Sequence, residues 1–122
     1  MIVVGAGNMG CAVAQYRSFT REGFEVEAMF DVDPAKVGSR LGNIPIFPMD
    51  DLENYLQDHR IDVAVLTLPV AMAQKTLDRV AACGVKAVWN FAPTDLQHPA
   101  EMIVVSDSLQ ILSYKMAHME DA

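Results

Sequence analysis

Glycines recur near the start of the chain in the run Gly5-Ala6-Gly7-Asn8-Met9-Gly10, directly after the apolar residues Ile2-Val3-Val4. A G-x-G-x-x-G pattern is informative when it joins a buried strand to a helix, as it does here. Gly5 permits the tight turn out of the strand, Gly7 lets the backbone approach a pyrophosphate, and Gly10 lets the helix pack closely on the sheet. The N–H groups at the start of the helix then face the negative charge of the pyrophosphate. We therefore predict that this run binds the pyrophosphate of a dinucleotide.

Acidic residues follow the second predicted strand. Asp31 comes about twenty residues after Gly10, where a carboxylate accepts hydrogen bonds from an adenosine ribose. The same carboxylate repels a 2′-phosphate, so NAD(H) is favoured over NADP(H). Asp33 is a second candidate, with a turn residue before Pro34 as the alternative. We expect Asp31, Val32 and Asp33 to contact the cofactor.

Two further strand ends should complete the cofactor-binding crevice, since dinucleotide-binding folds hold their ligands beyond the carboxyl ends of the strands. Thr67-Leu68-Pro69 follows the most hydrophobic run of the chain, and Asn90-Phe91-Ala92-Pro93 follows the next strand. Asn90 is a candidate partner for a carboxamide or ribose, and Phe91 for the wall of a nicotinamide pocket. The alternative for both stretches is ordinary strand-exit turn chemistry.

Short β-rich runs alternate with helical stretches, which predicts an α/β fold with a doubly wound, mainly parallel Rossmann-type sheet. The NAD(H)-binding domain should span residues 1–105, and residues 106–122 should form a C-terminal helix. Apolar residues recur in that tail at helical spacing, so the helix either folds back on its own sheet or is exchanged with a partner chain in an isologous dimer. We expect strands at 2–4, 24–30, 44–47, 61–68, 85–89 and 102–105, and helices at 9–21, after Asp50 or Asp51, at 71–82, and after Ser106 or Asp107.

Composition excludes several classes of protein. The 122 residues suffice for one domain, and the net charge of −7 argues against binding of nucleic acid by this stretch itself. No apolar run is long enough to span a membrane and no signal peptide is visible, so we expect a cytoplasmic protein. Two cysteines form neither a disulfide framework nor a metal knuckle. Cys11 is either a core-facing residue or, at the start of the first helix, a thiol with a lowered pKa.

We find no candidate catalytic centre and no metal-ligand cluster. The three histidines occupy a helix end, a proline-flanked loop and the tail, which are surface positions. A domain that holds a redox cofactor without a reaction centre is more plausibly a sensor than an enzyme. Two alternatives stay open: the cofactor half of an NAD-dependent dehydrogenase, and a stand-alone CoA-binding module. Against the first, Ala92 stands before Pro93 where such enzymes often place a catalytic lysine.

The chain resembles the cofactor-binding domain of the Rex family of redox-sensing transcriptional repressors. The order and spacing of the matching stretches also agree, so the resemblance covers nearly the whole chain. It implies a bacterial domain that senses NADH and NAD⁺, in which NADH reorients the two subunits of a homodimer and releases operator DNA. The matching stretches are Val4-Gly5-Ala6-Gly7-Asn8-Met9-Gly10, Phe30-Asp31-Val32-Asp33-Pro34-Ala35-Lys36-Val37-Gly38, Leu66-Thr67-Leu68-Pro69, Gly84-Val85-Lys86 and Asn90-Phe91-Ala92-Pro93.

The resemblance also implies a DNA-binding domain and a role for the C-terminal helix. Family members have an N-terminal winged-helix DNA-binding domain, whereas this sequence enters its first strand at once, so we expect DNA contact only through a domain absent from this chain. The C-terminal helix is expected to be exchanged between protomers near the nicotinamide, with Asp107 at its start. Cys11 stands where we expect a different, often basic, residue.

Overall fold

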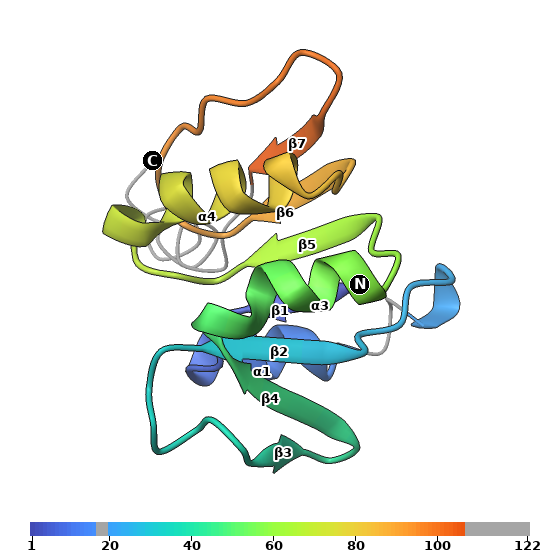
Figure 1. Ribbon diagram of the computed structural model, residues 1–122, viewed down its shortest axis with the longest axis vertical. Helices are drawn as coiled ribbons and strands as arrows, with labels where there is room; N and C mark the ends of the chain where they lie inside the picture. Colours follow the sequence, from blue (N-terminus) through green and yellow to red (C-terminus); the bar gives the residue numbers. More distant parts are fainter. Residues whose placement is uncertain (17–19, 107–122) are drawn as a thin grey trace, which may run out of the picture.

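A computed structural model describes residues 1–16 and 20–106. Its strands and helices alternate along most of the chain, as the sequence predicted (Figure 1). In chain order the elements are β1 (Ile2–Val4), α1 (Asn8–Ala14), β2 (Ala28–Asp31), β3 (Arg40–Leu41), β4 (Ile44–Pro48), the 3-10 turn η1 (Met49–Asp51), α3 (Leu52–Asp58), β5 (Val63–Leu66), α4 (Val70–Ala82), β6 (Ala87–Asn90) and β7 (Ile103–Ser106).

The described strands form one seven-stranded sheet in the order β3-β4-β2-β1-β5-β6-β7. Every neighbouring pair is parallel except β3 and β4, which are antiparallel. The chain winds outward from β1 in one direction through β2 and β4, and in the other through β5, β6 and β7. This is the doubly wound, Rossmann-type arrangement that the sequence predicted, and its switch point lies between β1 and β5.

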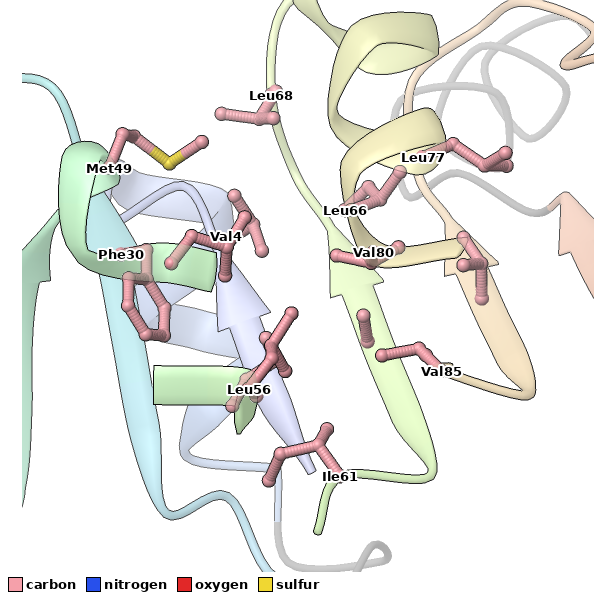
Figure 2. Close-up of a cluster of buried hydrophobic side chains, with 14 of the residues drawn as sticks. Val4, Phe30, Met49, Leu56, Ile61, Leu66, Leu68, Leu77, Val80 and Val85 are labelled. Carbon is pink, nitrogen blue, oxygen red and sulfur yellow. The ribbon is translucent and has the colours of Figure 1, made fainter. Parts of the chain in front are cut away.

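The larger core lies between the sheet and the helices α3 and α4, which are in front of it in Figure 1. Val4, Phe30 and Leu66, in register on β1, β2 and β5, face Leu56 of α3 and Leu77 of α4 (Figure 2). These strands are apolar on both faces, as expected in the middle of a parallel sheet. Their rigid carboxyl ends therefore form one edge from which the following loops emerge.

The opposite face carries a smaller core. Val13 of α1 packs there with Val3, Met29 and Val65 from β1, β2 and β5. Gly10 and Val13 are the buried residues of α1, which is only seven residues long. The helix thus covers the middle of the sheet on this side.

Several predicted boundaries were wrong. Helix α1 ends at Ala14, so the predicted helix at 9–21 is interrupted, although residues 20 and 21 are again helical. Strand β2 begins at Ala28, although the alternating pattern predicted a strand from residue 24. Asp51 occupies the predicted N-cap position of α3, but its side chain makes no capping hydrogen bond. Ser106 is the last residue of β7 and caps no described helix. The predicted C-terminal helix, its exchange and Asp107 lie outside the described residues.

Candidate functional site

The glycine loop leaves β1 at the switch point, and its backbone is held to both neighbouring strands. Gly5 has a φ of 107°, which favours glycine, and its N–H donates to the Phe30 carbonyl at 2.7 Å. A Cβ on Gly10 would lie 1.8 Å from the Gly5 carbonyl oxygen, so only glycine lets α1 pack this closely. A Cβ on Gly7 would meet nothing within 4 Å. The loop is therefore tightly packed against neighbouring backbone at Gly10, whereas free space lies beside Gly7.

A cavity of about 570 Å³ lies in front of this loop. Its walls come from the carboxyl ends of β1, β2, β5 and β6 and from the first turn of α4, so it sits at the predicted crevice. The lining is mostly apolar, which is usual for sites of organic ligands. The described lining residues are Gly5, Gly7, Asn8, Met9, Asp31, Val32, Thr67, Leu68, Pro69, Val70, Met72, Phe91, Ala92 and Pro93.

Asp31 is the one ionisable side chain among these described lining residues. Its Oδ2 accepts a hydrogen bond from the Ala6 N–H at 2.6 Å, and its Oδ1 accepts one from the Asp33 N–H at 2.8 Å. Each carboxylate oxygen keeps a second lone-pair direction, so the group can accept further hydrogen bonds from a ligand hydroxyl. Asp31 thus faces the cavity and also holds the loop.

Thr67 lies across the loop from Asp31. Its hydroxyl is 2.9 Å from the carbonyl oxygen of Gly5 and 3.1 Å from that of Val4, and it donates toward both. The backbone N–H of Thr67 also donates to the Val4 carbonyl, at 2.9 Å. Thr67 is therefore a lining residue whose polar atom points to the protein backbone.

The Asn90 side chain does not line the cavity, although it was a candidate for a contact with the ligand. It is fully buried, and its Nδ2 donates to the carbonyls of Ala92 and Thr94 while its Oδ1 accepts from the Ala92 N–H. These bonds shape the turn after β6 and bring Phe91 and Ala92 to the cavity. The alternative of turn chemistry thus describes the Asn90 side chain in this structure.

Eleven of the fifteen predicted binding residues line the cavity, and Ala6, Gly10, Asp33 and Asn90 do not. Asp33 is exposed, and its Oδ1 accepts from the Ala35 N–H at 2.9 Å, as a turn residue would. Pro93, which ends the stretch predicted after β6, also lines the cavity, and sequence reasoning missed Val70 and Met72. Val70 and Met72 follow Pro69 at the start of α4, and a rule that extends each strand end into the first turn of the next helix would have found them.

The remaining candidate groups lie away from the cavity. The Cys11 thiol donates to the Ala6 carbonyl at 3.4 Å, and its side chain packs on the smaller core. His59 ends α3, and His98 lines a separate polar hollow with Gln74 and Gln97. Within residues 1–16 and 20–106, no group of His, Cys, Asp and Glu side chains is placed to hold a metal ion, and no helix is long and apolar enough to cross a membrane.

Residues 1–94 match the family model described as CoA binding domain. The redox-sensing transcriptional repressor Rex of Clostridioides difficile (strain 630) is 42% identical over 119 residues, which cover 94% of this chain and 57% of the relative. Rex of Clostridium tetani (strain Massachusetts / E88) is 40% identical over 124 residues, covering 98% of this chain and 59% of the relative. The chain belongs to the CoA binding domain family, and nearly its whole length is similar to Rex repressors. It spans somewhat more than half the length of these Rex relatives, which are named as repressors and not as enzymes.

Solved structures agree with this assignment. RSP, described as a Rex-family repressor, superposes with a TM-score of 0.89 at 32% identity, over 98% of this chain and 57% of that one. RSP is also known in complex with β-NADH, with a TM-score of 0.88, and in complex with β-NAD⁺ and operator DNA, with a TM-score of 0.89. A UDP-D-quinovosamine 4-dehydrogenase from Vibrio fischeri, at 21% identity and a TM-score of 0.61, shares the fold alone.

Proposed function

We propose that this chain is the NAD(H)-binding, redox-sensing domain of a Rex-like bacterial repressor. The observation that carries the proposal is the cavity at the switch point, where the glycine loop is open at Gly7 and Asp31 stands at the edge of β2. A missing Cβ at Gly7 leaves room for a pyrophosphate against the backbone, and a carboxylate at this strand end suits a ribose diol. The similarity to RSP, which is known with β-NADH and with β-NAD⁺, supports the same ligand.

Each predicted residue has a part in this proposal. The loop from Gly5 to Gly10 holds the pyrophosphate through its backbone, and Asp31 and Val32 face the adenosine ribose. Leu68, Pro69, Phe91 and Ala92 form the apolar wall beside the nicotinamide. Four predicted residues contribute indirectly, because their hydrogen bonds hold the glycine loop and the turns after β2 and β6 in place. They are Ala6, Asp33, Thr67 and Asn90.

A homodimer is the form in which such a domain signals. NADH and NAD⁺ shift an equilibrium between two subunit arrangements only if they bind the two arrangements with different affinity. The exposed apolar residues Ile103 and Val105 on the edge strand β7 offer a surface for a second copy. We place residues 1–105 in the cofactor domain and assign residues 106–122 to exchange between protomers. Contact with operator DNA, in the cytoplasm, belongs to a winged-helix domain outside this sequence.

Parallel calorimetric titrations of the purified chain with NADH, NAD⁺, NADPH and CoA test the proposal. We expect NADH to bind most tightly, with NAD⁺ and NADPH weaker by about tenfold or more, because Asp31 opposes a 2′-phosphate and a sensor must discriminate between redox states. Binding of CoA alone would instead favour the CoA-binding alternative, which the description of the family model raises. Binding of none of the four would refute a nucleotide-sensing role for this chain.

A further inference from the structure

The glycine loop is held from two sides by side chains that also line the cavity. From β2, the Asp31 carboxylate accepts a hydrogen bond from the Ala6 N–H, and Thr67, the residue after β5, donates from its hydroxyl to the Gly5 carbonyl. The first half of the loop is therefore bonded to the carboxyl ends of both chain segments that flank β1. We call Asp31 and Thr67 the loop clamp.

The Asp31 side of this clamp has no ready substitute. Ala6 is 0% exposed, so its N–H has little access to water if the carboxylate is removed. The second oxygen of Asp31 binds the Asp33 N–H and so fixes the turn after β2 at the same time. An asparagine at position 31 has one acceptor oxygen, and its NH₂ group cannot accept a hydrogen bond. It would leave one of these two N–H groups without its partner.

The Thr67 side is set by close packing. A Cβ on Gly5 would lie 2.6 Å from the Thr67 hydroxyl oxygen, and one on Gly10 would lie 2.8 Å from it. The hydroxyl thus fills the space that two glycines leave free. Both residues of the clamp hold the loop through groups of the chain itself, and a loop held in this way loses less freedom when it binds a ligand.

We propose that Asp31 is a positioning residue for the glycine loop, in addition to facing the ribose. Removal of its carboxylate then weakens the binding of every dinucleotide, and does not convert the site to a preference for a 2′-phosphate. The part of this inference that concerns affinity rests on the proposed function. The part that concerns the loop does not, because the Ala6 hydrogen bond joins two groups of the chain itself.

Amide hydrogen exchange of the ligand-free chain, followed by NMR, tests the loop directly. We expect the Ala6 amide to be protected in the wild type and to exchange about tenfold faster or more in Asp31→Ala, which removes both acceptor oxygens. Asp31→Asn, which keeps one acceptor oxygen, should speed the exchange of either Ala6 or Asp33. Thr67→Val should also speed this exchange, and Thr67→Ser, which keeps the hydroxyl, should restore it. The matched control is Asp62→Asn, which removes an exposed carboxylate beside β5 at the opposite edge of the sheet. Unprotected exchange of Ala6 in the wild type would overturn the inference whether or not NADH binds.

Titration of the same variants with NADH and NADPH tests the consequence for selectivity. We expect Asp31→Asn to weaken NADH binding about tenfold or more while NADPH binds no more tightly than it does to the wild type. Tighter NADPH binding by Asp31→Asn, with unchanged exchange of Ala6, would show that the carboxylate acts on the ribose alone. Failure of NADH to bind the wild type would refute the proposed function and leave the exchange result standing.

Discussion

Gly7 and Gly10 belong to the same motif, but the atoms around them differ. A Cβ at Gly10 would collide with the Gly5 carbonyl, whereas a Cβ at Gly7 would project into open space. Gly7 also has a φ of −75° and a ψ of −167°, a conformation that alanine adopts without strain. The motif therefore contains one glycine required by the fold and one whose space is free for a ligand.

This contrast predicts that an alanine at Gly10 mainly lowers stability, whereas an alanine at Gly7 mainly weakens ligand binding. Gly10→Ala should lower the free energy of unfolding by about 1–3 kcal/mol, the usual cost of forcing an atom into a packed site. Gly7→Ala should change it by no more than about 0.5 kcal/mol but weaken NADH binding about tenfold or more, since its methyl group occupies the place of the pyrophosphate. Urea unfolding and calorimetry measure the two quantities, and each variant is the control for the other. Full NADH affinity in Gly7→Ala would place the pyrophosphate elsewhere.

The sequence predicted which strand ends meet, but not what each side chain does there. Residue type and spacing place Asp31, Thr67 and Phe91 at the cavity, because the carboxyl ends of parallel strands share one edge. The fate of individual polar groups depends on neighbouring backbone that the pattern does not specify. Asn90, for example, bonds to Ala92 and Thr94 two and four residues along the chain, and its side chain is fully buried.

At the scale of elements, the point where a strand begins depends on the strand that it pairs with more than on the alternation of polar and apolar residues. Residues 24–27 alternate in polarity, but β2 begins at Ala28 because β1, its neighbour, begins at Ile2, which pairs with Ala28. The short antiparallel strand β3 was missed, although Gly42-Asn43 between it and β4 is a two-residue turn of the kind that joins hairpins. Gly42 has the positive φ that such a turn requires, 60°.

Helices α3 and α4 are joined by an ion pair between the first turn of α3 and the last turn of α4. Arg79 donates from both Nε and Nη2 to the Glu53 carboxylate, and its Nη2 also donates to the Met49 carbonyl at 2.6 Å. The hydrogen bond from Arg79 holds the pKa of Glu53 below its usual value, and burial partly opposes this effect. The pair fixes η1 against α4, on the side of the sheet that carries the larger core.

This pair predicts a pH-dependent contribution to stability. Because the pKa of Glu53 is lower in the folded chain, its stabilising effect is complete above the unfolded pKa of about 4.3 and is lost as the pH falls through the folded value. Both side chains are partly exposed, so we expect Glu53→Gln to cost only about 1 kcal/mol at pH 7 and less near pH 3. Urea unfolding at both pH values checks this, with exposed Glu101→Gln as the control. An equal cost at both pH values would attribute the effect to packing.

At the scale of the whole fold, the described helices cover the two faces of the sheet unequally. Helices α3 and α4 pack on one face, and α1 packs on the middle of the other. Val65, Trp89 and Val105 are in register on β5, β6 and β7, so they point to the α1 side. Exposure rises along this row from buried Val65 to Val105, which is 52% exposed, and its neighbour Ile103 is 65% exposed. The apolar surface at β7 is the part of the described sheet best suited to a second copy.

The double variant Ile103→Thr/Val105→Thr tests this face as the interface of the proposed homodimer. Threonine suits a strand, and both side chains are exposed, so the monomer should keep its stability. Each substitution removes apolar contact worth about 0.8 kcal/mol per buried methylene, so we expect the dissociation constant of the dimer to rise about tenfold or more in sedimentation equilibrium. Phe24→Thr removes another exposed apolar side chain, before β2, and should leave the constant unchanged. A double variant that dimerises as tightly as the wild type would place the interface on another surface.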